Sequence, residues 1–305
     1  MKAFAIFRLL LVCFVALFPA ISRAIEPSQV INLWPETAPG EKGNIGEEHN
    51  VTKPTGKMTA NKPVVRIGNV SKPTISIFRP LATNDIGTTV LVFPGGAYNI
   101  IATDIEGTEV CQWLNSLGVT AVLLKYRVPR RAGLEKHVAP LQDAQRALSL
   151  VRHRATELKI DPKKIGVLGF SAGGHLAAAL STSAEKLTYT SVDAADTENC
   201  RPNFAMLIYP AYLTLTNNLE KLSPEVAVTT NHPPTFLAMT QDDPLHAENV
   251  LSYSLALKQA KVPVELHLYP SGGHGYGLRP TGNPVATWPD RAADWLRSRG
   301  LLSRR

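Results

Sequence analysis

From residue 73 onward, short apolar and β-branched runs alternate with segments of helical spacing. The run 119–125 (VTAVLLK), for example, is continuously apolar up to its last residue, as is typical of a strand buried on both faces of a parallel sheet. Strands are predicted at 73–79, 88–93, 119–125, 165–170, 204–209, 234–240 and 264–269, and helices at 106–117, 139–158, 172–183, 248–260 and 290–299.

This alternation predicts an α/β fold with a mostly parallel central sheet and helices on both faces. Neither an internal repeat nor a low-complexity linker interrupts it, so residues 73–305 are interpreted as a single domain. Residues 25–72 are rich in Pro, Gly, Asn, Lys and Glu and have little periodicity. We expect them to form an irregular lead-in that lies over the domain.

The first 24 residues have the pattern of a secretory signal peptide. Lys2 and Arg8 are followed by an apolar run at 9–18, and Ser22 and Ala24 place small residues where a signal peptidase cleaves. The run is short for a membrane span, which argues against an uncleaved anchor. We therefore expect cleavage after Ala24, no stable membrane anchor afterwards, and a secreted or periplasmic protein.

The 305 residues are 44% apolar and 19% charged, which suits a sizeable core and excludes a disordered or fibrous chain. Without residues 1–24, Lys and Arg exceed Asp and Glu by four. The basic residues are scattered, apart from a few near the C-terminus, and form no basic stripe with interleaved aromatics. A nucleic-acid partner is therefore not expected.

Two cysteines, Cys111 and Cys200, lie beyond the expected cleavage site. An oxidising compartment would permit a disulfide between them, and two separate buried thiols are equally compatible with the sequence. The spacing of Cys and His residues indicates no zinc site.

A G-x-S-x-G motif at residues 169–173 supplies the first candidate for chemistry. It directly follows an expected strand and opens an expected helix, which is the setting of a nucleophile elbow. In such a turn the Ser171 hydroxyl is lifted clear of the sheet, beside the positive end of the helix. Ser171 is therefore the candidate nucleophile, although a serine that merely caps the helix is the simpler alternative.

A serine hydroxyl needs a base, and the chain contains eight histidines. His274 follows the last expected strand within a glycine-rich loop (SGGHGYG), where α/β hydrolases carry their base. His267 falls within that strand, His153 and His175 fall on helices, and His246 is too close in sequence to the candidate acid. We expect His274 to be the general base.

The acid should follow a strand between the serine and the histidine. The strand at 234–240 is followed by Asp242 and Asp243, and either carboxylate could orient the imidazole of His274. We favour Asp243, because the Asp-Pro-Leu sequence places it at the start of a turn, with Asp242 left to cap the turn or face solvent. The chain order Ser171, Asp243, His274 is that of α/β hydrolases.

The oxyanion formed during acyl transfer needs hydrogen-bond donors. The backbone N–H of Ala172, next to the nucleophile, is one candidate. The P-G-G-A-Y segment at 94–98 follows an early strand and offers Gly96 and Ala97, although a common glycine-rich turn is the simpler alternative.

Four segments together, PGGAY at 94–98, LKYRVP at 124–129, GFSAGGH at 169–175 and GGHG at 272–275, resemble the secreted acetyl xylan/feruloyl esterase-like family of α/β hydrolases. The resemblance covers nearly all of the chain beyond residue 24. It implies hydrolysis of acetyl or feruloyl esters on plant polysaccharides without a cofactor, and it carries the catalytic roles onto Ser171, Asp243 and His274. Lipase relatives usually have His-Gly-Gly-Gly at the oxyanion strand, where this chain has Pro94 and Ala97 at the first and fourth positions.

Three other functions compete with this interpretation. A serine peptidase of the prolyl-oligopeptidase type shares the fold and chain order, but residues 25–72 are too few for the large N-terminal domain that such enzymes usually carry. A general small-molecule carboxylesterase fits the same motifs. A non-catalytic binding scaffold typically lacks one member of the triad, whereas all three residue types are present here.

Overall fold

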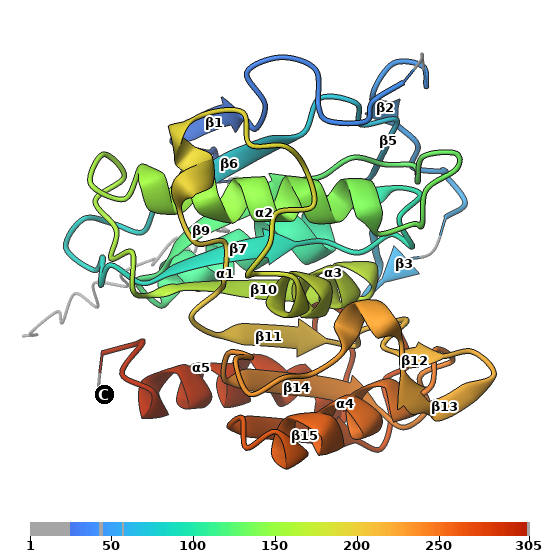
Figure 1. The fold of residues 1–305 in the computed structure, drawn as a ribbon. Helices are drawn as coiled ribbons and strands as arrows, with labels where there is room; N and C mark the ends of the chain where they lie inside the picture. Colours follow the sequence, from blue (N-terminus) through green and yellow to red (C-terminus); the bar gives the residue numbers. More distant parts are fainter. Residues whose placement is uncertain (1–24, 43–44, 57, 304–305) are drawn as a thin grey trace, which may run out of the picture.

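The computed structural model describes residues 25–42, 45–56 and 58–303. Its centre is an eight-stranded sheet with the order β1-β6-β9-β7-β10-β11-β14-β15 (Figure 1). The strands from β9 to β15 run parallel, while β6 is antiparallel to both of its neighbours. The strand bounds are β1 Gln29–Asn32, β6 Thr74–Phe78, β7 Thr89–Phe93, β9 Thr120–Lys125, β10 Ile165–Phe170, β11 Ala205–Ile208, β14 Thr235–Thr240 and β15 Val264–Tyr269.

In the part of the chain that the structure describes, five α-helices cover the sheet: α1 Glu109–Ser116, α2 Val138–His153, α3 Ala172–Thr182, α4 Glu248–Gln259 and α5 Trp288–Ser298. The chain moves from β7 to β9 through α1, and then crosses back past β7 to β10 through α2. Because such crossovers are right-handed, this reversal places α1 and α2 on opposite faces. Helix α3 packs on α2, and α5 meets α1 through Trp288 and Trp113, whose ring centroids lie 5.5 Å apart. The predicted α/β architecture is confirmed.

Complete burial explains why several strands do not alternate between apolar and polar residues. Every residue of β7, β10 and β14 is buried, as expected for central parallel strands with helices on both sides. The parallel strands all end at the same edge of the sheet, where the crossover loops leave. In open α/β sheets this edge carries the functional loops.

The expectation of an irregular lead-in needs correction, because residues 25–72 contain regular elements. Strand β1 pairs with β6 at the edge of the main sheet, and two small sheets are formed by β2 (His49–Asn50), β5 (Arg66–Gly68) and β8 (Ile101–Ala102), and by β3 (Met58–Thr59) and β4 (Lys62–Pro63). Buried arginines hold the segment to the domain. Arg127 donates to the carbonyl of Pro39 at 2.7 Å, and Arg131 donates to the Glu41 carboxylate at 2.7 Å.

Two helix boundaries differ from the predictions by three residues or more, and the others by two at most. The helix expected at 106–117 begins as a π-helical turn, η1 (Asp104–Thr108), before α1. The helix expected at 139–158 ends at His153. The remaining short elements are η2 (Ala194–Thr197), η3 (Pro224–Val226), η4 (Pro284–Thr287) and a hairpin of β12 (Thr214–Leu215) and β13 (Asn218–Leu222).

Cys111 and Cys200 are both buried free thiols, so the structure contains two separate cysteines and not a disulfide between them. Burial raises the pKa of Cys111, and it raises that of Cys200 to about 11. Within the described ranges, no helix has the length and apolar character that a membrane crossing requires. The expected signal peptide, residues 1–24, lies outside the described residues.

Candidate active site

Ser171 occupies a strained turn between β10 and α3, with φ 52° and ψ −119°. Such a backbone conformation is rare for a residue with a side chain and occurs at functional turns. The flanking glycines make the turn possible. A Cβ on Gly173 would lie 1.9 Å from the carbonyl oxygen of Phe93, and one on Gly169 would lie 2.1 Å from that of Gly173. The sharp turn therefore requires glycine at both positions.

His274 reaches Ser171 from the loop after β15. Its Nε2 lies 2.9 Å from Ser171 Oγ, and its Nδ1 lies 2.8 Å from Oδ2 of Asp243. The side chain of Asp243 is fully buried, whereas that of His274 is one-fifth exposed. This is the geometry of a nucleophile, a base and a carboxylate that fixes the tautomer of the base.

The adjacent carboxylate, Asp242, bonds to the backbone of the histidine loop, the loop after β15, and not to the imidazole. It accepts hydrogen bonds from the backbone N–H groups of Gly273 at 2.9 Å and Gly272 at 3.2 Å. These two bonds lower the pKa of Asp242. Asp243 also accepts the N–H of Leu245 at 2.8 Å, which orients the carboxylate that faces His274.

Other histidines lie in ordinary packing or surface positions. His175 on α3 is completely buried, with Nδ1 2.9 Å from Tyr98 Oη and Nε2 3.3 Å from Glu225 Oε1. His267 lies within β15 beside Glu265, and His246 is exposed.

The glycine-rich loop at residues 94–98, which carries the candidate oxyanion donors and is called the oxyanion loop below, follows β7 and lies against Ser171. A Cβ on Gly95 would lie 2.7 Å from Ser171 Cβ, so only glycine allows this approach. The N–H of Gly95 is already bonded to Glu106 Oε2, at 2.6 Å. Gly96, with φ 134°, and Ala97, with φ 54°, follow it in the left-handed region. The loop thus turns sharply beside Ser171.

Two buried groups at this site were missed in the sequence. Glu106 of η1 contacts the oxyanion loop, and Tyr209, which follows β11, donates its hydroxyl to Glu106 at 2.9 Å. The ring of Tyr209 lies 4.9 Å, centroid to centroid, from that of His274. No local motif marks either residue. Glu106 is one of three acidic residues in the segment DIEGTE at 104–109, so its type alone does not distinguish it.

A cavity of about 360 Å³ adjoins the candidate triad. Its lining includes Ala211, whose N–H donates to the Ser171 carbonyl at 3.1 Å, and Pro244, which follows Asp243. The hairpin β12–β13 supplies part of its wall, and the ammonium of Lys136 lies 3.4 Å from the ring centroid of Tyr212 at its rim. Its volume lies within the usual range of small-molecule binding sites.

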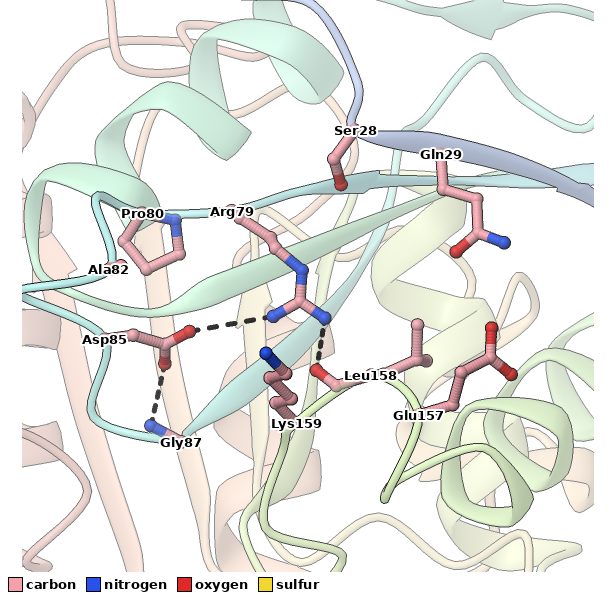
Figure 2. A pocket seen from close by; sticks show the side chains of 10 residues that line it. All are labelled: Ser28, Gln29, Arg79, Pro80, Ala82, Asp85, Gly87, Glu157, Leu158 and Lys159. Atoms are coloured by element: carbon pink, nitrogen blue, oxygen red, sulfur yellow. Dashed lines mark hydrogen bonds and ion pairs between the residues drawn. The ribbon is translucent and has the colours of Figure 1, made fainter.

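A larger cavity, of about 610 Å³, lies at the opposite edge of the sheet, where β6 ends and β7 begins (Figure 2). Arg79 reaches both Asp85 and the carbonyl of Leu158 there, and Lys159 and Glu157 add one charge of each sign. Its charges are balanced, and no member of the candidate triad lines it. Among the residues that the structure describes, no cluster of three or more His, Cys, Asp or Glu side chains could hold a metal ion.

Comparisons with known proteins agree with this geometry. The family model described as BD-FAE matches residues 75–200, and that of the prolyl oligopeptidase family matches residues 138–299. An acetylxylan esterase of Xylanibacter ruminicola is 28% identical over 244 residues, 72% of this chain and 47% of that protein. Endo-1,4-beta-xylanase B of Butyrivibrio fibrisolvens is 28% identical over 219 residues, 66% of this chain and 34% of that protein.

Among solved structures, an acetyl ester-xyloside bifunctional hydrolase from Caldicellulosiruptor lactoaceticus superposes with a TM-score of 0.70. The two chains are 32% identical, and the match covers 92% of this chain and all of the other. This chain spans about half the length of the acetylxylan esterase and about a third of the length of the xylanase.

The fold and the Ser–His–Asp arrangement define an α/β hydrolase. Within that class, the chain belongs to the prolyl oligopeptidase family and to an acetyl xylan esterase-like family. The predicted family resemblance is confirmed.

Proposed function

We propose that this protein is a serine esterase that removes acetyl groups, or feruloyl groups, from plant polysaccharide such as xylan. The observation that supports it best is the continuous chain of contacts from Ser171 Oγ to His274 Nε2, and from His274 Nδ1 to Asp243, at 2.9 and 2.8 Å. The acetylxylan esterase and the acetyl ester-xyloside hydrolase among its relatives support the substrate class.

The proposed reaction has two halves. Ser171 Oγ attacks the ester carbonyl while His274 accepts the hydroxyl proton, and the N–H groups of Gly96, Ala97 and Ala172 stabilise the oxyanion. His274 then gives the proton to the sugar oxygen as its bond to the acyl carbon breaks, so that the sugar leaves with a free hydroxyl and an acyl-enzyme remains. Water, giving one proton to His274, attacks that ester, and His274 passes this proton to Ser171 Oγ as the product leaves as a carboxylic acid, which then ionises in solvent. No cofactor is required by these steps.

The test is release of acetate from acetylated xylan by the purified protein, with Ser171→Ala as the matched control. We expect acetate from the wild type only. No acetate from either protein would contradict the xylan assignment, and equal release from both would contradict the role of Ser171.

A serine peptidase is the second candidate, because the prolyl oligopeptidase model matches residues 138–299. A proline-containing p-nitroanilide and p-nitrophenyl acetate, offered to the same protein, separate the two. The proposal requires faster turnover of the ester. Preferential cleavage of the anilide would replace the esterase assignment with a peptidase.

We further propose that the protein is exported and cleaved after Ala24. The basic residues, apolar run and small residues of segment 1–24 support this. N-terminal sequencing of protein recovered from outside the cytoplasm should begin at Ile25. Recovery of intact Met1 there would contradict cleavage.

A further inference from the structure

Glu106 is a buried carboxyl group that the proposed reaction does not use. It is 4% exposed and lies in the π-helical turn η1, an element that is rare and often marks functional sites. In the described part of the chain, no lysine or arginine pairs with it. A buried carboxylate lowers stability unless hydrogen bonds replace its lost hydration. The groups that donate hydrogen bonds to Glu106 therefore indicate its role.

The first partner is the oxyanion loop. Gly95 donates its N–H to Glu106 Oε2 at 2.6 Å, a short charge-assisted bond. A Cβ on Gly95 would lie 2.7 Å from Ser171 Cβ and 2.8 Å from Glu106 Oε2, so the loop is enclosed between nucleophile and carboxylate. The N–H groups that follow Gly95 are therefore placed relative to Ser171 by this bond.

The second partner leads to the histidine loop. Tyr209 donates its hydroxyl to Glu106 Oε1 at 2.9 Å and accepts the N–H of Gly277 at 3.1 Å. Gly277 lies three residues after His274, and the Tyr209 ring packs edge-on against the imidazole. One carboxylate thus connects the loop of the oxyanion donors with the loop of the base.

We propose that Glu106 is a positioning residue that sets the oxyanion donors and His274 relative to Ser171, through Gly95 and through Tyr209. This role rests on the proposed esterase function. Burial raises the pKa of Glu106, while the hydrogen bonds from Gly95 and Tyr209 lower it. Burial also raises the pKa of Tyr209, which keeps its hydroxyl protonated as a donor.

The test uses Glu106→Gln and Tyr209→Phe in the full chain, with p-nitrophenyl acetate as substrate and active serines titrated by an organophosphate. An amide keeps the shape of the carboxyl group but replaces one of its two acceptor oxygens by an NH2 group, so one of the two donors that now bond to Glu106 would lose its acceptor. We expect kcat per active serine to fall about 10²-fold for Glu106→Gln and about 10-fold for Tyr209→Phe, with KM changed less than about threefold. Because both act on one network, the double variant should lose less than the product of the two effects.

Glu157→Gln is the matched control, because Glu157 is an exposed glutamate at the opposite edge of the sheet (Figure 2). It should keep wild-type kcat. A purely structural role for Glu106 would lower thermal stability and the number of active serines, but leave kcat per active serine unchanged, and that result overturns the proposal. If Glu106→Gln does not fold, an unchanged kcat in Tyr209→Phe overturns it equally. Wild-type protein that hydrolyses no ester would instead refute the proposed function.

Discussion

Asp242 and Asp243 are neighbours in the chain, and their carboxylates bond to successive parts of one loop. Asp242 accepts the N–H groups of Gly272 and Gly273, whereas Asp243 lies 2.8 Å from Nδ1 of His274. One carboxylate thus supports the backbone of the loop, and the other meets the imidazole that the loop carries.

This difference predicts unequal effects of two similar substitutions. Asp243→Asn should reduce kcat about 10³- to 10⁴-fold, because an amide stabilises the wrong tautomer of the base and cannot stabilise imidazolium. Asp242→Asn retains an oxygen acceptor for the loop and should cost less than about tenfold. Steady-state kinetics with p-nitrophenyl acetate measure both. The reverse order of effects would show that Asp242 is the acid.

The nucleophile turn should not tolerate a methyl group at Gly173. A Cβ there would lie 1.9 Å from a backbone carbonyl, which cannot move without displacing β7 and the oxyanion loop. We expect Gly173→Ala to lose more than about 3 kcal/mol of unfolding free energy or to yield no folded protein.

Gly133→Ala is the control for that substitution. Gly133 has φ 76° and open space around its Cα, so only backbone strain of about 1 kcal/mol is expected. Chemical denaturation compares the two variants. Equal unfolding free energies of the two variants would show that the turn at Ser171 can accommodate a Cβ at residue 173 and would contradict the prediction.

Removing one partner of the buried Arg127–Asp143 ion pair should strongly lower the free energy of unfolding. The Arg127 Nε lies 3.0 Å from Asp143 Oδ1, and both side chains are almost completely buried. Asp143 also accepts the indole N–H of Trp34 at 2.9 Å. Asp143→Ala leaves a buried guanidinium unpaired and should cost about 3–5 kcal/mol.

Asp294→Ala removes an exposed partner of Arg297 on α5 and serves as the comparison. It should cost less than about 0.5 kcal/mol. Urea denaturation measures both variants. A small loss of unfolding free energy in both would contradict the prediction that the buried pair is the more sensitive to loss of one partner.

Stability should fall in mild acid because of His232. Burial lowers the pKa of His232 from 6.5 to about 4, and its Nδ1 accepts the N–H of Thr229 at 3.0 Å, which requires a neutral ring. Between these two pH values the unfolded chain binds the proton more readily, so stability is complete above about pH 6.5 and is lost toward pH 4, by up to about 3 kcal/mol.

His232→Asn offers an oxygen in place of Nδ1 and should flatten the dependence of Tm on pH between 6.5 and 4. Burial also lowers the pKa of His137 and His175, so part of the slope should remain. An unchanged slope in the variant would show that His232 does not contribute.

The sequence alone was sufficient for the order and type of the main elements, since burial patterns and turn residues are local properties. The strands at 165–170 and 264–269 have the predicted bounds. The G-x-S-x-G turn and the glycine-rich loop of His274 could likewise be found locally, because both depend on glycine at fixed positions.

Only the tertiary structure decided which groups meet. Ser171 and His274 are 103 residues apart, and the orientation of Asp243 depends on how its turn packs against a loop 31 residues later. Glu106 gained its position from packing between two loops, and the arginines that hold residues 25–72 act on distant carbonyl groups. Local propensity carries no information about such contacts, because their free energy comes from burial and hydrogen bonding between segments that the chain brings together only on folding.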